Sequence, residues 1–245
     1  MHQQKAFTLV EMSIVIVIIG LLAGAVLAGQ SLVRASEVRS VITGFHKYVT
    51  ASATFQDKYG ALAGDFVNAN SNWSAATPGN GNGVIDYGAG GGVAGENFGF
   101  WQQLALAGLI EGQYSGLTGA NGNRHAIPGT NVPKGRMDSS GYYVEYWGTV
   151  DPSNSWFWSG PANNVMTFGQ LNGSGPTENP IMTPEEAYNI DSKIDDGRPG
   201  LGSIQTYRQN GLWVNCVTSN AQTTTTYNIS YSNWACQLTY VDFTS

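Results

Sequence analysis

The strongest hydrophobic segment of the chain lies at its N-terminus. Residues 6–33 contain a single charged side chain, that of Glu11, and residues 14–28 are aliphatic apart from glycines and alanines. A helix rises about 1.5 Å per residue, so residues 7–29 are long enough to cross a hydrocarbon core of roughly 30 Å. An ionised carboxylate at that depth costs roughly 3 kcal/mol, and Glu11 therefore requires a partner or a function.

The pattern that follows predicts that the same helix continues to residue 59. Apolar residues recur every three or four positions with charged residues between them, which is the spacing of one helical face. No proline occurs before Pro78, so nothing forces the helix to end earlier. A helix over residues 7–59 would be about 80 Å long, apolar all round in its first half and amphipathic in its second. The apolar positions of the second half are Val38, Val41, Ile42, Phe45, Tyr48, Val49, Phe55 and Tyr59.

Beyond residue 59 the hydrophobic segments are short and separated by turns. Residues 60–95 are rich in Gly and Asn and predict loops, residues 96–110 predict a helix, and residues 142–147 and 165–168 predict strands. Another helix is predicted to start with Thr183 as its N-cap, Pro184 at its first position and Glu186 three residues after the cap. A long N-terminal helix packed against a globular head with an antiparallel sheet and large loops is an α+β fold.

Composition and charge narrow the function classes. Hydrophobic residues make up 42% of the 245 residues, which suffices for a core, whereas charged residues reach only 11%, well below the ordinary quarter. The 11 basic against 17 acidic side chains give a net charge of −6, and no basic patch predicts nucleic-acid binding. The 3 histidines show neither a catalytic-triad order nor a metal-ligand spacing. We therefore expect a structural protein rather than an enzyme, with no catalytic residues.

Three interpretations of the N-terminal segment compete. The first is a secretory signal peptide with a small-residue cleavage site near residues 26–28, although an acid at the start of its apolar region is unusual. The second is a plain membrane anchor, which leaves Glu11 unexplained. The third is a resemblance: a short basic leader, a small residue and then Phe-Thr-Leu-Val-Glu-Met before an aliphatic run is similar to the start of type IV pilins and type II secretion pseudopilins. We favour the resemblance because Phe, Thr, Leu and Glu match in register.

The resemblance implies a processing site and a place of action. In that family a membrane prepilin peptidase cuts before the Phe and N-methylates the new terminus, here between Ala6 and Phe7. The family usually has Gly where this chain has Ala6. The implied partners are the peptidase, an inner-membrane assembly platform, and copies of this chain or other pilins. The chain would span the inner membrane before assembly and enter an extracellular or periplasmic filament afterwards.

The resemblance also gives Glu11 a role in assembly. Cleavage creates an ammonium group on Phe7, and Glu11 of an incoming subunit would pair with the Phe7 amine of its neighbour. At an effective dielectric constant near 20, such a pair at about 4 Å gains roughly 4 kcal/mol before desolvation. The expected domains are a leader (1–6), a long helix (7–59, with 7–29 in the membrane or filament core) and a pilin-like head (60–245).

Two further predictions concern the head. In an exported protein the cysteine pair Cys216 and Cys236 predicts a disulfide, and a C-terminal disulfide loop is also familiar in type IV pilins. We expect a surface hairpin inside that loop. Asp191, Asp195 and Asp196 could hold a cation such as Ca²⁺, although a helix end followed by a solvated turn is favoured; otherwise no cofactor is expected.

A binding role is the alternative to a purely structural one. The chain has 7 Trp and 12 Tyr, several of them in Gly-rich loops, where they could stack on sugar rings. The alternative function is therefore a minor or tip pilin that acts as an adhesin or carbohydrate-binding module. Core packing explains most of these aromatic residues equally well.

Overall fold

The computed structural model describes residues 8–88 and 94–244. Among these, the structure has an α+β fold that begins with the long helix α1 (Leu9–Tyr59). The chain divides into two units, Met1–Arg39 and Ser40–Ser245, and α1 begins in the first and ends in the second. Helix α1 ends at the expected residue, whereas the expected start at Phe7 lies outside the described residues.

The part of α1 that belongs to the second unit is amphipathic, as its pattern predicts. Val41, Phe45, Tyr48 and Phe55 are buried, whereas the charged side chains between them are exposed. Gly60, with a φ of +68°, follows the last helical residue in the left-handed conformation typical of a helix end.

Helix α3 (Glu96–Leu106) packs its aromatic side chains against α1 and the sheet. The rings of Trp101 and Tyr48 lie 5.0 Å apart, and those of Phe98 and Tyr143 lie 5.8 Å apart. The helix ends before the expected residue 110 because Gly108 adopts a positive φ of 72° and the Leu109 amide turns back to the Leu104 carbonyl. A four-residue helix, α2 (Ala69–Asn72), lies in the loop before α3.

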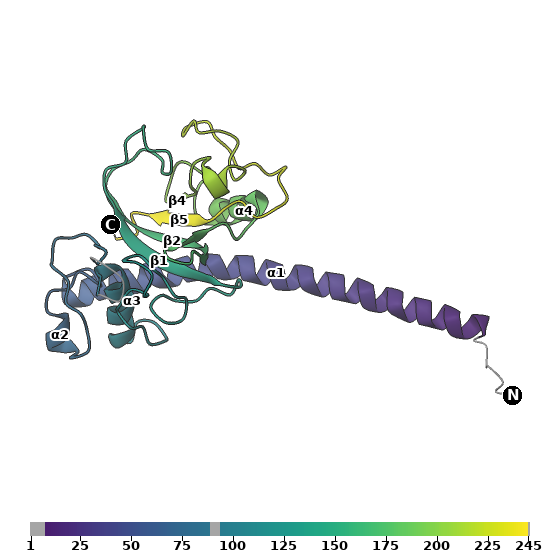
Figure 1. The fold of residues 1–245 in the computed structure, drawn as a ribbon, viewed down its shortest axis with the longest axis horizontal. Coiled ribbons are helices and arrows are strands. Elements are labelled where there is room, and N and C mark those ends of the chain that lie inside the picture. Colours follow the sequence, from purple (N-terminus) through teal and green to yellow (C-terminus); the bar gives the residue numbers. More distant parts are fainter. Residues whose placement is uncertain (1–7, 89–93, 245) are drawn as a thin grey trace. The chain divides into compact units, whose positions relative to one another are not determined.

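The head contains one five-stranded sheet in the order β1-β2-β5-β4, with β3 paired to β2, and every pairing is antiparallel. Figure 1 shows this sheet beside α4. The central pair runs from Ser140 opposite Gln170 to Trp147 opposite Asn163. The two strands expected from the sequence are therefore the longest ones, and both are longer than expected. The bounds are β1 (Ser140–Trp147), β2 (Asn163–Leu171), β3 (Thr177–Asn179), β4 (Ile204–Gln205) and β5 (Leu238–Val241).

Tyr142 on β1 joins the sheet to α1. Its ring contacts the rings of Phe45 and Tyr48 on α1 and of Phe168 on β2, at centroid distances of 5.6, 4.9 and 4.8 Å. Its hydroxyl donates to two carbonyls of α1, at 3.4 Å each. This close approach requires Gly44, because a Cβ there would lie 1.9 Å from the Tyr142 hydroxyl oxygen.

Helix α4 (Pro184–Ile194) has the predicted N-terminus. The Thr183 hydroxyl accepts from the Glu186 amide at 3.2 Å, and the Glu186 carboxylate accepts from the Thr183 amide at 2.9 Å. Both bonds together form the capping box that the Thr-Pro-Glu-Glu sequence predicts.

Candidate functional site

The start of α1 is held by Thr8 and Glu11. The Glu11 carboxylate accepts hydrogen bonds from both the amide and the hydroxyl of Thr8, each at 2.8 Å, and the Thr8 hydroxyl accepts from the Glu11 amide at 3.2 Å. This reciprocal arrangement is a capping box, in which an N-cap Thr and a Glu three residues later satisfy helix amides that have no partner within the helix. The expected processing residues Ala6 and Phe7 lie outside the described residues, so the cleavage site and the Phe7 amine stay predictions.

The first unit exposes its hydrophobic side chains. From Leu9 to Val33 the large apolar residues are between 47% and 90% exposed, the extremes being Val15 and Leu9. Within the described residues, α1 is long and apolar enough to cross a membrane. Side chains of this kind require burial in lipid or against other chains. The apolar helix therefore fits a membrane-anchored precursor.

The predicted disulfide joins Cys216 to Cys236, with the Cα atoms 5.0 Å apart and both residues fully buried. The loop that it closes is less regular than expected. A single antiparallel bridge, Val217 opposite Tyr227, lies within it, and none of the named strands does. The expected hairpin is present only as this short antiparallel pairing, in which the Thr218 amide donates to the Thr226 carbonyl and the Asn228 amide to the Cys216 carbonyl, both at 2.9 Å.

The structure places the three aspartates of the predicted cation site together at the end of α4. One oxygen from each of Asp191, Asp195 and Asp196 lies within 4.8 Å of the others. Each carboxylate also accepts hydrogen bonds from the protein itself. Asp191 accepts from the Tyr227 hydroxyl at 2.9 Å and from the Gly197 amide at 3.1 Å, Asp195 from the Ile204 amide at 3.1 Å, and Asp196 from the Arg198 amide at 2.8 Å.

Burial dominates the electrostatics of this cluster. Asp191 is completely buried, and this burial raises the pKa of its carboxyl group to about 7, against the opposing hydrogen bonds from Tyr227 and Gly197. The neighbouring charges of Asp196 and Asp195 raise the pKa further. These contacts account for the cluster as part of the fold, and cation binding stays a prediction.

A second set of carboxylates organises the loop between α2 and α3. The buried Asp65 carboxylate accepts from the amides of Gly81, Asn82 and Gly83 at 2.5, 3.1 and 2.8 Å. Glu96 accepts from the amides of Asn80 and Asp86, and burial raises the pKa of Glu96. The Asn-Gly repeat of residues 80–83 therefore forms a turn around Asp65. Its Gly and Asn residues are those typical of turns.

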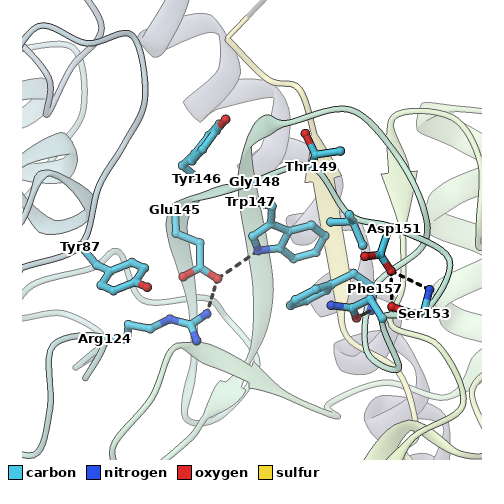
Figure 2. A pocket seen from close by; sticks show the side chains of 12 residues that line it. Tyr87, Arg124, Glu145, Tyr146, Trp147, Gly148, Thr149, Asp151, Ser153 and Phe157 are labelled. Atoms are coloured by element: carbon cyan, nitrogen blue, oxygen red, sulfur yellow. Dashed lines mark hydrogen bonds and ion pairs between the residues drawn. The ribbon is translucent and has the colours of Figure 1, made fainter.

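Sequence reasoning missed a partly buried ion pair between Arg124 and Glu145. Figure 2 shows the Arg124 guanidinium next to the Glu145 carboxylate, which also accepts from the Trp147 indole at 3.0 Å. Glu145 is only 3% exposed. The two residues lie in different segments, 21 positions apart. The one indication of this ion pair in the sequence was the charged Glu145 within a strand pattern. These residues border a pocket of about 340 Å³ that Tyr87 and Phe157 also line.

The aromatic residues divide into a buried majority and a small exposed group. Trp101, Trp158 and Trp213 are at most 5% exposed and have the core role, which was one of the two alternatives that the sequence left open. Trp156 and Trp234, in contrast, are 42% and 53% exposed. Trp156 lies in a second pocket, of about 560 Å³, together with Trp213.

Comparison with known proteins matches the N-terminus of the chain to a family model. Residues 1–27 match the family model of the prokaryotic N-terminal methylation motif. Neither the curated proteins nor the solved structures contain a significant match to the chain. The match covers the segment that contains Thr8, Glu11 and the first part of the exposed apolar helix.

Proposed function

Because residues 1–27 carry the prepilin-type cleavage and methylation signal of type IV pilins and pseudopilins, we propose that this chain is a structural subunit of a type IV pilus or pseudopilus. Prepilin peptidase removes residues 1–6 and methylates Phe7. An inner-membrane assembly platform then polymerises the chain, with itself or with other pilins, into an extracellular or periplasmic filament.

The observation that carries this proposal is the position of Glu11. It is the single charged residue within positions 6–33, and it lies at the N-terminal end of a helix whose apolar side chains are exposed. A plain anchor gains nothing from such a carboxylate, which makes insertion less favourable. In a filament, the carboxylate pairs with the Phe7 amine of a neighbouring subunit and fixes the axial position of each subunit.

The capping box gives the Glu11 carboxylate hydrogen-bond partners in the unassembled subunit. In the single chain, Glu11 accepts two hydrogen bonds from Thr8. Capping interactions of this kind stabilise a helix by about 1 kcal/mol. The carboxylate is thus partly satisfied within its own chain, at the end of the helix where backbone amides favour a negative charge.

Substitution of Glu11 tests the proposal. We expect Glu11→Gln and Glu11→Ala to be inserted into the membrane and to fold their heads, yet to fail to enter filaments. Asp57→Asn is the matched control, because it removes an exposed carboxylate from the same helix outside the apolar segment, and it should assemble normally. The measurement compares the yield of sheared filaments with the membrane pool of each variant. Normal incorporation of both Glu11 variants would refute the pairing.

Mass spectrometry of the mature N-terminus tests the processing step separately. We expect the chain to begin at Phe7 with a methylated amine. A chain that begins at Met1 or at Gly29 would contradict the proposed subunit, the first because the leader is retained and the second because a signal peptidase has acted instead.

A further inference from the structure

We propose that the head has a saccharide-binding pocket, formed where the segment of residues 154–157, strand β3 and the short helix η1 (Gly211–Trp213) meet. The proposed ligand is a neutral saccharide of one or two rings. The pocket encloses about 560 Å³, a volume within the usual range for small-molecule sites. We call it the aromatic pocket. The lining residues that matter here are Trp156, Phe157, Asn172, Glu178, Tyr207 and Trp213.

Aromatic rings form the walls of this pocket. The rings of Trp156 and Trp213 lie 5.4 Å apart at an interplanar angle of 80°, and those of Phe157 and Tyr207 lie 5.1 Å apart at 86°. Tyr207 and Trp213 are 4.9 Å apart and connect the two pairs. The faces of aromatic rings are electron-rich, and they attract the weakly positive C–H bonds on the face of a sugar ring. The 42% exposure of Trp156 leaves part of its indole available for such stacking.

Hydrogen-bonding groups lie against these walls. The Glu178 carboxylate accepts from the Tyr207 hydroxyl and from the Asn172 side-chain amide, both at 3.1 Å. A carboxylate has about four acceptor positions, so two remain for ligand hydroxyls. Among the described residues, none donates a hydrogen bond to the side-chain oxygen of Asn172 or of Asn179. A cluster of acceptors beside aromatic faces suits a ligand with many hydroxyl donors.

The charge of the pocket favours a neutral ligand over an acidic one. Arg124 lines the aromatic pocket, but its charge is offset by the ion pair with Glu145. The guanidinium and the two carboxylates, those of Glu145 and Glu178, together carry one net negative charge when all three are ionised. Burial raises the pKa of Glu178, while Arg124 opposes this shift. A carboxylate or phosphate on the ligand would add a further negative charge beside Glu145 and Glu178.

The segment that carries Trp156 and Phe157 is fixed in place before any ligand binds. The Arg208 amide donates to the Trp156 carbonyl at 3.0 Å, the Arg208 guanidinium donates to the carbonyls of Pro152 and Asn154, and the Asn210 side chain donates to the Ser155 carbonyl at 3.2 Å. The Asn154 side chain in turn accepts from the amides of Trp156 and Phe157.

The opposite wall is equally fixed. The Trp213 indole donates to the Glu178 carbonyl at 3.1 Å, and the Cys216 amide of the disulfide donates to the Trp213 carbonyl at 3.0 Å. Walls that are held in this way lose little entropy when a ligand binds, which favours measurable affinity for a small molecule.

The test is a titration of the detergent-solubilised full chain, followed by saturation-transfer NMR of the sugar. The probes are cellobiose and the disaccharide of N-acetylglucosamine as neutral ligands, with glucuronic acid as the acidic one. We expect at least one neutral disaccharide to bind with a Kd at or below about 1 mM, and glucuronic acid to bind more weakly.

Substitutions then locate the binding. Trp156→Ala should weaken binding about tenfold or more, as is typical for the loss of an aromatic anchor, and the isosteric Glu178→Gln should weaken it as well. Trp234→Ala is the matched control, because it removes another half-exposed tryptophan that does not line the pocket, and binding should be unchanged.

Three results would overturn the inference. These are no saturation transfer to either neutral disaccharide at about 20 mM, tighter binding of glucuronic acid than of the neutral sugars, or unchanged affinity in Trp156→Ala. The measurement uses the unassembled subunit. Its failure leaves the filament role intact, and a failure of the Glu11 test leaves the pocket intact.

Discussion

Neutralising the buried Asp191 should remove a pH dependence from the stability of the head. Its side chain is completely buried, and this burial raises its pKa from 3.8 to about 7. A folded-state pKa above the unfolded value means that the folded head binds the proton more tightly than the unfolded chain. The free energy of unfolding should therefore be highest in acid and should fall as the pH rises from about 4 to about 7.

The size of this pKa shift sets the size of the effect on stability. The difference between 3.8 and about 7 corresponds to at most about 4 kcal/mol at roughly 1.4 kcal/mol per pKa unit. Asp195 is half-buried and Asp196 is exposed, so water screens part of this penalty, and we expect about 2 kcal/mol. For a head of this size that corresponds to a melting-temperature difference of about 4–8 °C.

Asp191→Asn is the appropriate variant because it preserves the contacts. The Asn oxygen can still accept from the Gly197 amide, and the Tyr227 hydroxyl can rotate to accept from the Asn amide instead of donating. We expect the variant to be more stable than the wild type at pH 8 and to differ little from it near pH 4. Asp57→Asn, which removes an exposed acid, controls for the change in net charge.

Tryptophan fluorescence reports this unfolding directly, because all 7 tryptophans lie beyond residue 59. The assay is denaturant unfolding of the full chain in detergent, at several pH values between 4 and 8 and with a chelator present. If the free energy of unfolding of Asp191→Asn falls with pH as steeply as that of the wild type, Asp191 is not the group responsible and the argument from burial is wrong.

Two further predictions concern the packing of α1 and the acidic cluster. Gly44→Ala should destabilise the head by about 1–3 kcal/mol, despite the better helix propensity of Ala, because the new Cβ meets the buried Tyr142 hydroxyl; thermal unfolding measures this. Gly29→Ala, whose Cβ would meet nothing within 4 Å, should leave head stability unchanged, and equal effects of the two would refute the steric reason. If the three aspartates bind calcium, about 1 mM calcium should raise the melting temperature above that in chelator, and Asp196→Asn should abolish the rise. An unchanged melting temperature removes the cation site.

The elements that the sequence predicted are those with local signals. The capping box of α4 depends on Thr183 and Glu186, three residues apart, and the amphipathic part of α1 repeats its pattern over several turns. The same kind of signal was present but overlooked at two other places. Thr8 and Glu11 have capping-box spacing, and Gly108 marks the end of α3.

The remainder of the fold had no local signal. Strand β4 has 2 residues and β5 has 4, and their place in the sheet depends on partners far away in the sequence, such as Thr167 opposite Thr239. The aromatic pocket likewise depends on contacts between residues far apart in the sequence. Trp156, Glu178 and Trp213 come from three segments that tertiary contacts bring together, and composition alone could only indicate that aromatic residues were abundant.

The capping box changes the energetics of the proposed filament contact. A pair between Glu11 and a neighbour's Phe7 amine does not form from a free carboxylate, because Glu11 already accepts two hydrogen bonds from Thr8. In the proposed filament, assembly would exchange the Thr8 partner of Glu11 for the Phe7 amine of a neighbour. The net gain is the roughly 4 kcal/mol of the ion pair, reduced by desolvation and by about 1 kcal/mol for any lost capping. In the proposed filament, a difference of this small size would fix the position of each subunit and would leave the adhesion between subunits mainly to the exposed apolar side chains of α1.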